Sequence, residues 1–307
     1  MGNGAVGTRG GARGRIAGVR RVGRLARRLA RALRRAVAPA EGRRFEATRP
    51  PTGQDGGGPG DIGHLLAAAP TFAVELRAAK QQLAPADLWY PYQSLDNLAH
   101  LNRLLTPGHR DLQALADRRP IADIGGADGD LAFLLARQGF TVDVIDWGPT
   151  NFNGLRGVRL LADHFATTVS VHEIDLDAQF QLPRDDYGLV LLLGILYHLQ
   201  NPLYILRQLA RRSRHMLLST RIARVTADRS VRLDRAPVAY LVDPAETNND
   251  STNWWIFSPP GLRRLLDRAG WDVLDQITVG RTGGDSNPAQ PDRDERAFCL
   301  VRSRGRP

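Results

Sequence analysis

From residue 120 onward, the sequence alternates regularly between short apolar runs and amphipathic segments. The strands that the apolar runs predict lie at residues 121–125, 141–146, 168–174, 187–196 and 215–221, with helices near 129–138, 154–165 and 202–213. This alternation is typical of a parallel sheet with helices on both faces. After a further helix at 258–269, the strand patterns "WDVLDQITV" and "ERAFCLV" are joined by a loop too short for a crossover helix. We expect these two strands to form an antiparallel hairpin at the sheet edge.

The part of the chain before this alternation differs sharply in composition. Residues 1–49 contain 14 Arg, no Lys and two acidic residues, a charge of +12, whereas the whole chain carries +10. The remaining residues are therefore close to neutral, at −2. A Pro/Gly-rich stretch, "RPPTGQDGGGPGD", follows the arm and is typical of a linker. The organisation we expect is a basic, disordered arm and linker at 1–61, a helical cap at 62–118, and a larger domain at 119–307 with an insertion at 222–257.

The basic arm supports more than one interpretation. Its apolar residues recur every three or four positions, which predicts a basic amphipathic helix. Contact with a membrane surface or a nucleic acid, a targeting peptide, and a tail shaped by a GC-rich genome all fit this pattern. Because the rest of the chain is nearly neutral, the high overall charge does not by itself make the folded part a nucleic-acid binder.

Composition also restricts the class of protein. No stretch reaches the roughly 18 consecutive apolar residues of a membrane-spanning helix. The single cysteine, Cys299, excludes an intrachain disulfide and a cysteine-based zinc site, and its place in "RAFCLV" predicts a buried strand residue. We therefore expect a cytoplasmic protein with no metal site.

The first predicted strand runs into a glycine-rich turn, "ADIGGADGD", and a helix follows at once. A dinucleotide fingerprint would place its three glycines at Gly125, Ala127 and Asp130, so two of the three positions fail. Asp128 and Asp130 would also put negative charge close to a pyrophosphate. S-adenosylmethionine has no phosphate and carries a sulfonium and an ammonium. We therefore expect these two aspartates to favour S-adenosylmethionine over a dinucleotide.

Further carboxylates follow the next two strands. Asp146 ends the second strand, 21 residues after Gly125, where a carboxylate can accept both ribose hydroxyls. The third strand ends "VHEIDLD", which offers Asp175 or Asp177 to an adenine amino group. Acidic residues at the carboxyl ends of three successive strands predict a nucleoside site at this edge of the sheet.

Residues 120–303 resemble a class I S-adenosylmethionine-dependent methyltransferase. Asp123, Gly125 and Gly129 match the family's D-x-G-x-G-x-G loop, and Ala127 departs from its middle glycine. The resemblance implies a Rossmann-like α/β fold, with a mostly parallel seven-stranded sheet, an antiparallel last strand and an N-terminal helical cap. It also implies S-adenosylmethionine as the cofactor. The cofactor-binding residues that it implies are Asp123, Gly125, Gly126, Gly129, Asp146, Asp175, Leu176, Gly194 and Tyr197.

A narrower resemblance concerns the acceptor. "GILYHLQNPL" and "TNWWIFSPPGLRRLLDRAGW" are similar to segments of the methyl- and carboxymethyltransferases of the tRNA wobble uridine. In this loop His198 is either a general base or a structural histidine. Two aromatic and polar clusters either pack the cap or form a lid over the substrate. The substrate residues we expect are Trp89, Tyr90, Tyr92, Asn249, Asp250, Trp254 and Trp255.

Three functions remain open at this point. The favoured one is methyl transfer to a small molecule. A tRNA-modifying enzyme is the alternative that would use the basic arm as its nucleic-acid contact. The third is a module that binds the cofactor without catalysis.

Overall fold

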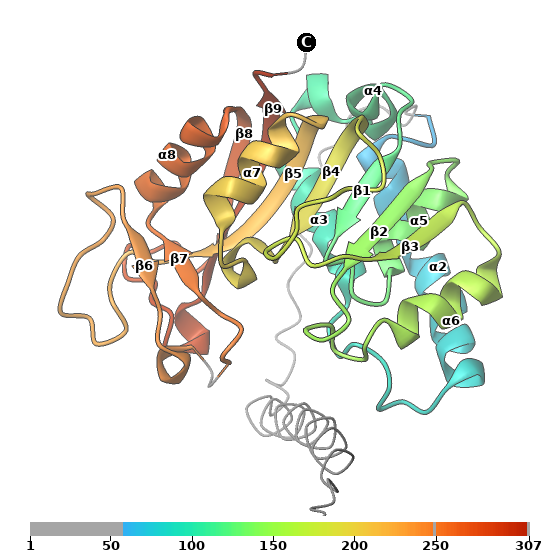
Figure 1. The fold of residues 1–307 in the computed structure, drawn as a ribbon, viewed down its shortest axis with the longest axis horizontal. Helices are drawn as coiled ribbons and strands as arrows, with labels where there is room; N and C mark the ends of the chain where they lie inside the picture. Colours follow the sequence, from blue (N-terminus) through green and yellow to red (C-terminus); the bar gives the residue numbers. More distant parts are fainter. Residues whose placement is uncertain (1–57, 248–249, 306–307) are drawn as a thin grey trace, which may run out of the picture.

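A computed structural model describes residues 58–247 and 250–305, and within them the expected Rossmann-like fold is confirmed. Seven strands run in the order β3-β2-β1-β4-β5-β9-β8, all parallel except β9 (Figure 1). Their bounds are β1 Ile121–Ile124, β2 Val142–Asp146, β3 Val169–Glu173, β4 Tyr187–Leu193, β5 Ser213–Ile222, β8 Trp271–Gly280 and β9 Glu295–Ser303. Each strand therefore begins and ends within a few residues of its expected position.

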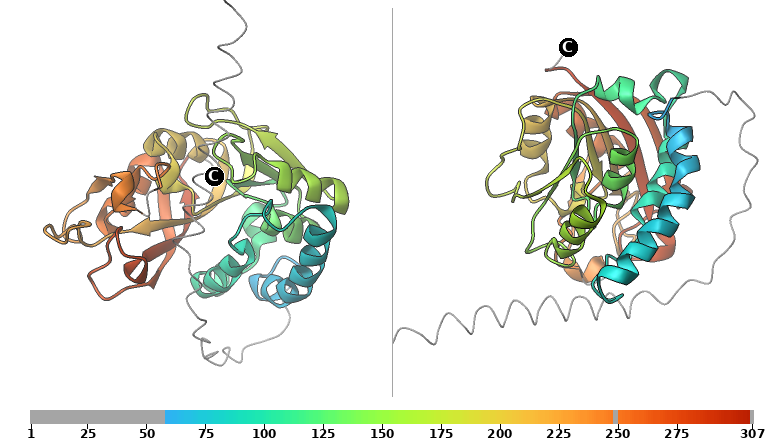
Figure 2. Two further views of the ribbon diagram at one scale, coloured as in Figure 1. Left: turned by 90° about the horizontal axis from the view of Figure 1, so that it is seen from below. Right: turned by 90° about the vertical axis from the view of Figure 1, so that its right-hand side faces the viewer.

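The helices cover both faces of this sheet (Figure 1 and Figure 2). Their bounds are α2 Ile62–Leu83, α3 Asn97–Leu104, α4 Leu112–Ala116, α5 Asp130–Arg137, α6 Arg156–Phe165, α7 Pro202–Ala210 and α8 Pro259–Ala269. One face of the sheet shares a core with α2, α3, α5 and α6. The other face packs on α7 and α8. The predicted cap helices thus belong to the same hydrophobic core as the sheet.

The strands form because apolar runs are buried on both sides. Every residue of β4 except its last is buried, as expected for a central strand of a parallel sheet. This strand ends at Leu193 rather than at the expected residue 196, because Gly194 turns the chain with φ +81°. The final hairpin is also as expected: β9 lies between β5 and β8 and is antiparallel to both, with Cys299 buried within it.

The insertion after β5 contains a feature that the sequence did not predict. Two short strands, β6 (Ala239–Leu241) and β7 (Trp255–Phe257), form an antiparallel ribbon that joins the sheet at the end of β5. The ribbon has a small core of its own around Val242 and Ile256. Residues 248 and 249 of this insertion lie outside the described part of the chain.

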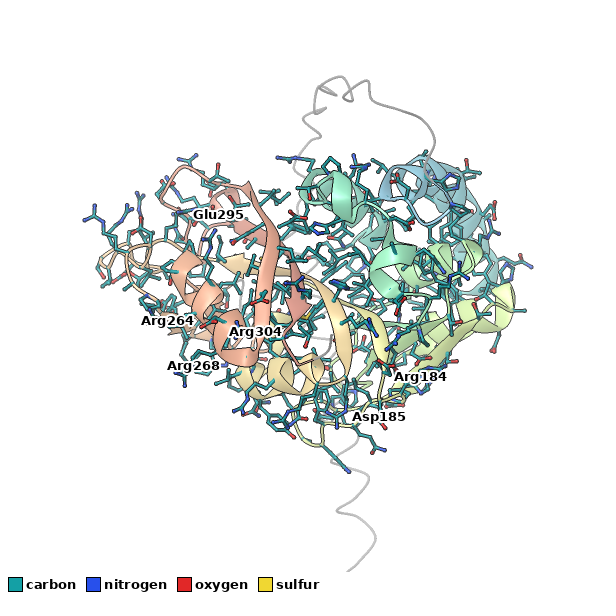
Figure 3. The ribbon with its side chains drawn as sticks, turned by 90° about the horizontal axis from the view of Figure 1, so that it is seen from above. Arg184, Asp185, Arg264, Arg268, Glu295 and Arg304 are labelled. Atoms are coloured by element: carbon teal, nitrogen blue, oxygen red, sulfur yellow. The ribbon has the colours of Figure 1, made fainter. Side chains whose placement is uncertain are left out.

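A buried carboxylate ties the insertion to the sheet. Glu295, the first residue of β9, is fully buried, and Figure 3 labels it at the top of the red hairpin. Both of its oxygens accept hydrogen bonds from Arg224 at 2.8 Å, and one also accepts from Ser286 Oγ at 2.6 Å. This bidentate pair fixes the segment that follows β5.

None of the described helices is both long and apolar enough to span a membrane.

A tight contact between α4 and β4 generates a test of the packing. A Cβ added at Gly188 would lie 1.7 Å from the carbonyl oxygen of Ala116, so the backbone of one element would have to move. Gly188→Ala should therefore lower the free energy of unfolding by about 3 kcal/mol, measured by urea denaturation. Gly108→Ala is the matched control, since nothing lies within 4 Å of its added Cβ. Equal stability of the two variants would contradict this packing.

Candidate active site

The residues expected to bind the cofactor meet at the carboxyl ends of β1, β2, β3 and β4. Gly125 follows β1 with φ +68°, and its N–H donates to the Ile145 carbonyl of β2 at 2.8 Å. A Cβ on Gly125 would lie 2.2 Å from Ile195 Cδ1, and the positive φ by itself favours glycine at this position. Gly129 has φ +81° and immediately precedes Asp130, the first residue of α5. The turn and helix N-terminus therefore adopt the geometry of a ligand-binding loop.

Ala127 occupies the position where the related loop has a glycine. Its φ is +54°, in the left-handed region that residues with a Cβ rarely adopt. This conformation costs an alanine about 1 kcal/mol. The loop therefore keeps the shape of the glycine-rich motif despite the substitution, at the expense of local strain.

Asp146 is held in the position expected of a ribose ligand. One carboxylate oxygen accepts from the Trp147 N–H at 2.7 Å and the other from Asn151 Nδ2 at 2.8 Å. Burial raises the pKa of this carboxyl, while those hydrogen bonds and the Ala127 amide oppose the shift. Each oxygen retains a lone pair, so the carboxylate can accept two vicinal hydroxyls.

Asp123, at the third position of β1, is an unpaired buried carboxyl. It is 4% exposed, and no hydrogen bond or ion pair to its carboxylate is found in the described part of the chain. Burial, together with the charges of Asp146 and Asp130, raises its pKa to about 7. A buried carboxyl without a cation is the environment that a positively charged ligand would stabilise. The loop therefore fits a cofactor with a sulfonium and an ammonium.

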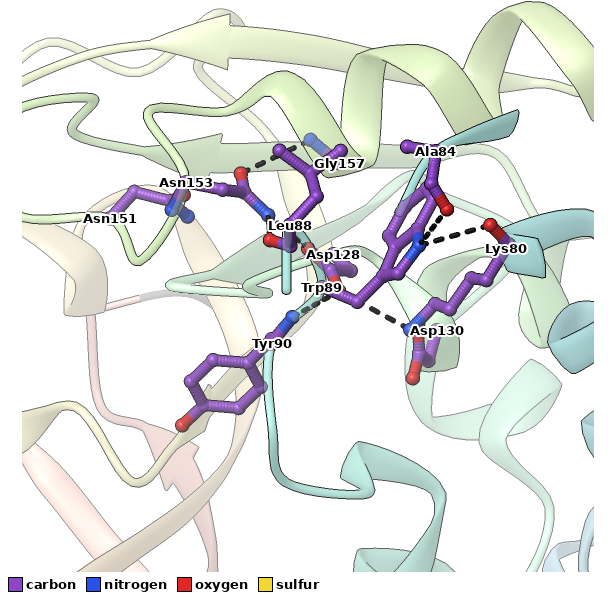
Figure 4. Close-up of polar contacts among 10 residues, drawn as sticks. All are labelled: Lys80, Ala84, Leu88, Trp89, Tyr90, Asp128, Asp130, Asn151, Asn153 and Gly157. Carbon is purple, nitrogen blue, oxygen red and sulfur yellow. Dashed lines mark hydrogen bonds and ion pairs between the residues drawn. The ribbon is translucent and has the colours of Figure 1, made fainter. Parts of the chain in front are cut away.

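The two aspartates of the turn have a structural role that the sequence did not predict. The ammonium of Lys80, on α2, lies 3.2 Å from Asp128 and 2.8 Å from Asp130, and all three side chains are largely buried (Figure 4). One ammonium between two carboxylates leaves a net charge of −1 at the turn, so the preference of these aspartates for a cationic cofactor stays a prediction. We call Lys80, Asp128 and Asp130 the latch, since together they fasten α2 to the cofactor loop.

Other contacts of Asp128 extend the latch to the segment after α2. Asp128 accepts from the Tyr90 N–H at 2.8 Å and from Asn153 Nδ2 at 2.7 Å. The neighbouring Trp89 is 8% exposed, and its indole N–H donates to the carbonyls of Lys80 and Ala84 (Figure 4). This placement favours a packing role for Trp89 over contact with a substrate.

The remaining cofactor candidates lie around the same edge. Asp175 Oδ1 accepts from the N–H groups of Asp177 and Ala178, which closes a turn after β3 and leaves Oδ2 without a partner among the described residues. Leu176 is buried beside it. Asp177, the other adenine candidate, instead accepts from the backbone of Gln200 and residue 201 and so anchors the loop after β4.

That loop carries His198, and the insertion after β5 holds its ring. His198 Nδ1 lies 3.1 Å from the Thr252 carbonyl oxygen and 3.0 Å from Thr252 Oγ1. Thr252 Oγ1 in turn donates to Asp250 Oδ1 at 2.6 Å. Because a carbonyl can only accept, the proton of neutral His198 resides on Nδ1, and Nε2 keeps its lone pair. Burial lowers the pKa of His198, with Asp250 and Thr252 opposing this, so the ring is neutral near pH 7.

The aromatic residues expected around the substrate are only partly brought together. Tyr197 is 8% exposed and packs on the His198 ring at 4.3 Å between centroids, and the Trp254 N–H donates to its carbonyl at 2.8 Å. Tyr90 packs on Tyr92, with 5.3 Å between ring centroids. Trp255 instead lines a groove of about 630 Å³ between α7 and the β6–β7 ribbon.

Two predicted positions need a separate statement. Asn249 lies outside the described residues. Gly194 turns the chain after β4, and a Cβ there would lie 3.6 Å from the Tyr197 hydroxyl.

No group of three or more potential metal ligands is found within residues 58–247 and 250–305.

Several residues of this site were not singled out from the sequence. Lys80, Thr252 and Arg296 reach it from distant segments, and only Lys80 left a signal. It is the single lysine in a chain with 42 basic residues. A lone lysine among arginines indicates a position that a bulkier guanidinium does not fit.

The latch generates a stability prediction. Lys80→Met leaves two buried carboxylates without their cation, so it should lower the free energy of unfolding by about 3–5 kcal/mol. Chemical denaturation followed by circular dichroism measures this. Glu75→Gln is the control, because it removes an exposed ion pair with Arg137 from the same helix and should leave the midpoint unchanged. A Lys80→Met protein as stable as the native one would show that the latch does not hold the cap.

Asp123 generates a prediction about pH. Its folded pKa of about 7 exceeds the ordinary 3.8, so the folded state binds the proton more tightly than the unfolded chain. This contribution to stability is complete below about pH 4 and is lost as the pH rises through 7. Asp123→Asn should therefore be more stable than the native protein at pH 8 by up to about 4 kcal/mol, but not at pH 4. Asp163→Asn, at an exposed site on α6, should leave the pH dependence unchanged.

Comparison with known proteins identifies a family and similar folds. A family model described as a methyltransferase domain matches residues 91–276. The fold resembles the N-terminal domain of EvdMO1, crystallised in the presence of SAH and D-fucose, at 18% identity and a TM-score of 0.50, over 76% of this chain and 97% of that one. The CcbJ methyltransferase from Streptomyces caelestis is 15% identical, with a TM-score of 0.42 over 62% of this chain and 86% of that one.

Curated protein sequences contain no match to this chain. The family model, in contrast, spans more than half of the 307 residues, and that extent decides the assignment. The chain belongs to the methyltransferase domain family and is an S-adenosylmethionine-dependent methyltransferase.

Proposed function

We propose that the protein transfers a methyl group to a hydroxyl or amine of a small molecule, and that His198 accepts the proton that this group loses. The observation that carries the proposal is the chain of contacts from His198 Nδ1 through Thr252 to Asp250. A histidine that only shaped its loop would not need a second residue and a carboxylate to orient it. A base needs this, because its function depends on which nitrogen is free.

The cofactor's part follows from the residues at the strand ends. S-adenosylmethionine supplies a methyl group activated by its sulfonium. Asp146 would hold the ribose hydroxyls, and the segment at Asp175 and Leu176 would hold the adenine. The loop from Gly125 to Gly129 and the unpaired Asp123 would hold the methionyl part.

His198 has the three properties that a general base requires at neutral pH. Its lowered pKa keeps the imidazole unprotonated. The Thr252 carbonyl fixes the proton on Nδ1 and so leaves Nε2 as the accepting atom. The ring belongs to the short helix η3 (Leu196–His198). This helix follows the end of β4 at Leu193 after the two-residue turn Gly194–Ile195, so the ring stands beside the cofactor edge of the sheet. Proton transfer to such a base contributes typically 10²–10⁴-fold to the rate.

The charge of the chain favours a small acceptor over tRNA. A tRNA-modifying enzyme needs a basic surface to contact phosphates. Residues 50–307 carry a net charge of −2, and the basic excess resides in the arm, which lies outside the described residues. Methylation of the tRNA wobble uridine is therefore the second candidate, supported by the charge of the arm and by the resemblance of the His198 loop and the α8 segment to those enzymes.

The role of His198 is tested by substitution. His198→Gln should lower kcat by about 10²–10⁴-fold while S-adenosylhomocysteine still binds, because the cofactor site is unchanged. Thr252→Val removes the hydroxyl between His198 and Asp250 and should lower kcat by about tenfold. The measurement is release of S-adenosylhomocysteine with a panel of small alcohols, phenols and amines.

The pH profile and a control complete this test. Because burial lowers the pKa of His198 from 6.5, the acidic limb of the activity profile should have its midpoint below pH 6.5. His164→Gln, at an exposed position on α6, should leave kcat unchanged. A His198→Gln enzyme with native kcat would exclude the base role.

A further inference from the structure

Arg296 is a charged residue at the acceptor side of the site that the mechanism above does not use. It is the second residue of β9 and pairs in register with Arg221 at the end of β5. Its guanidinium carbon lies 5.9 Å from the centre of the Tyr197 ring, and its Nη1 lies 3.5 Å from the Tyr197 hydroxyl oxygen. Its charge also acts on Tyr90 and His198, which come from two further segments. Arg296 thus stands where the cap, the β4 loop and the sheet converge.

The Arg296 side chain stays partly exposed although several segments converge on it. The Arg296 side chain retains 38% of its accessible surface, against 8% for Arg221 beside it. Its Nε donates to Asp294 at 3.1 Å, and no described residue accepts a hydrogen bond from Nη2. One edge of the guanidinium fork is therefore free to bind a ligand.

The local charges do not balance. Asp294 is shared between the two arginines, accepting from Arg221 Nε at 2.6 Å with one oxygen and from Arg296 with the other. No other carboxylate among the described residues forms an ion pair with either guanidinium. Two cations and one anion leave a net charge of +1 at this position. Burial opposes the charge on Arg296, but Tyr197 and Asp294 raise its pKa on balance, so the residue remains a cation.

Two phenols can add hydrogen-bond donors on this side of the site: Tyr197 contacts Arg296, and Tyr90 is within the influence of its charge. Burial raises the pKa of Tyr90 well above its ordinary value, with Tyr197 and Tyr92 adding to the shift, so its O–H remains a donor. The ring of Tyr90 points away from the latch (Figure 4). The Tyr197 oxygen can accept from Arg296 and still donate its own proton. A guanidinium edge beside a phenol supplies the kind of donors that a planar carboxylate accepts.

We propose that Arg296, with Tyr90 and Tyr197, binds a carboxylate of the methyl acceptor, so that the substrate is a hydroxy or amino acid. This rests on the proposed function, because it places the anion beside the same base. A Cβ on Gly194 would lie 3.9 Å from Arg296 Nη1, so the guanidinium is close to the loop that carries His198. A net charge of +1 suits a monoanionic carboxylate better than a phosphate dianion. Asp123, the glycine-rich loop and Asp146 follow β1 and β2, and β4 and β5 lie between β1 and the strand β9 that carries Arg296.

The test compares acids with their uncharged counterparts. Salicylate, mandelate and lactate, each against its carboxamide, are titrated by calorimetry into the protein loaded with S-adenosylhomocysteine. At least one acid should bind about 10- to 100-fold more tightly than its amide. Arg296→Gln should abolish this preference, and Arg296→Lys, which keeps the charge but loses the fork, should retain part of it. Arg302→Gln, on the exposed end of the same strand, is the control and should bind as the native protein does.

Two results would overturn the proposal. One is that no acid binds better than its amide. The other concerns the carboxylate of the cofactor itself: Arg296→Gln would weaken binding of S-adenosylhomocysteine but not of methylthioadenosine, which lacks the amino-acid part. Native affinity for S-adenosylhomocysteine also shows that the variant is folded. Because these are binding measurements, they are independent of turnover, so a failed base role for His198 is distinguished from a failed anion site.

Discussion

The ion pairs of Lys80 with Asp128 and Asp130 are the interaction on which the site depends. They join the first helix of the cap to the loop that receives the cofactor. Asp128 also accepts from the Tyr90 amide, so the same carboxylate positions the aromatic segment that follows α2. Loop, cap and aromatic residues are therefore not three independent parts. A movement of α2 would alter the cofactor loop and the acceptor side together.

The acidic residues at this edge fall into two electrostatic classes. Asp128 and Asp130 have a cation and serve the fold, whereas Asp123 has none and Asp146 has only neutral donors. Burial raises the pKa of Asp123 to about 7, and it also raises the pKa of Asp146 and of Asp130, the last against the opposing charge of Lys80. A ligand with positive charge and hydroxyl groups would relieve what the protein leaves unsatisfied. Burying these carboxyls without a cation lowers the stability of the fold and leaves this edge of the sheet pre-organised for a ligand.

The sequence was sufficient for what depends on local pattern and insufficient for what depends on long-range pairing. Strand periods and turn glycines predicted the sheet, and the position of Asp146 at a strand end placed it correctly. The role of Asp128 could not be predicted, because its partner Lys80 lies 48 residues away on α2, and the sequence does not show where this helix packs. The same holds for Thr252, which reaches His198 from an insertion whose β6–β7 ribbon left too short a pattern to recognise.

The amino-acid composition gives the latch an unusual property. Lys80 is the single lysine of the sequence, so its ammonium is the one side-chain amine that an acylating reagent can find. The Lys80 side chain is 15% exposed, and its ammonium lies between two carboxylates. Because acylation needs an uncharged amine, it requires the ion pairs of the latch to break. The rate at which Lys80 is acylated therefore reports how often the ion pairs that hold α2 to the cofactor loop break.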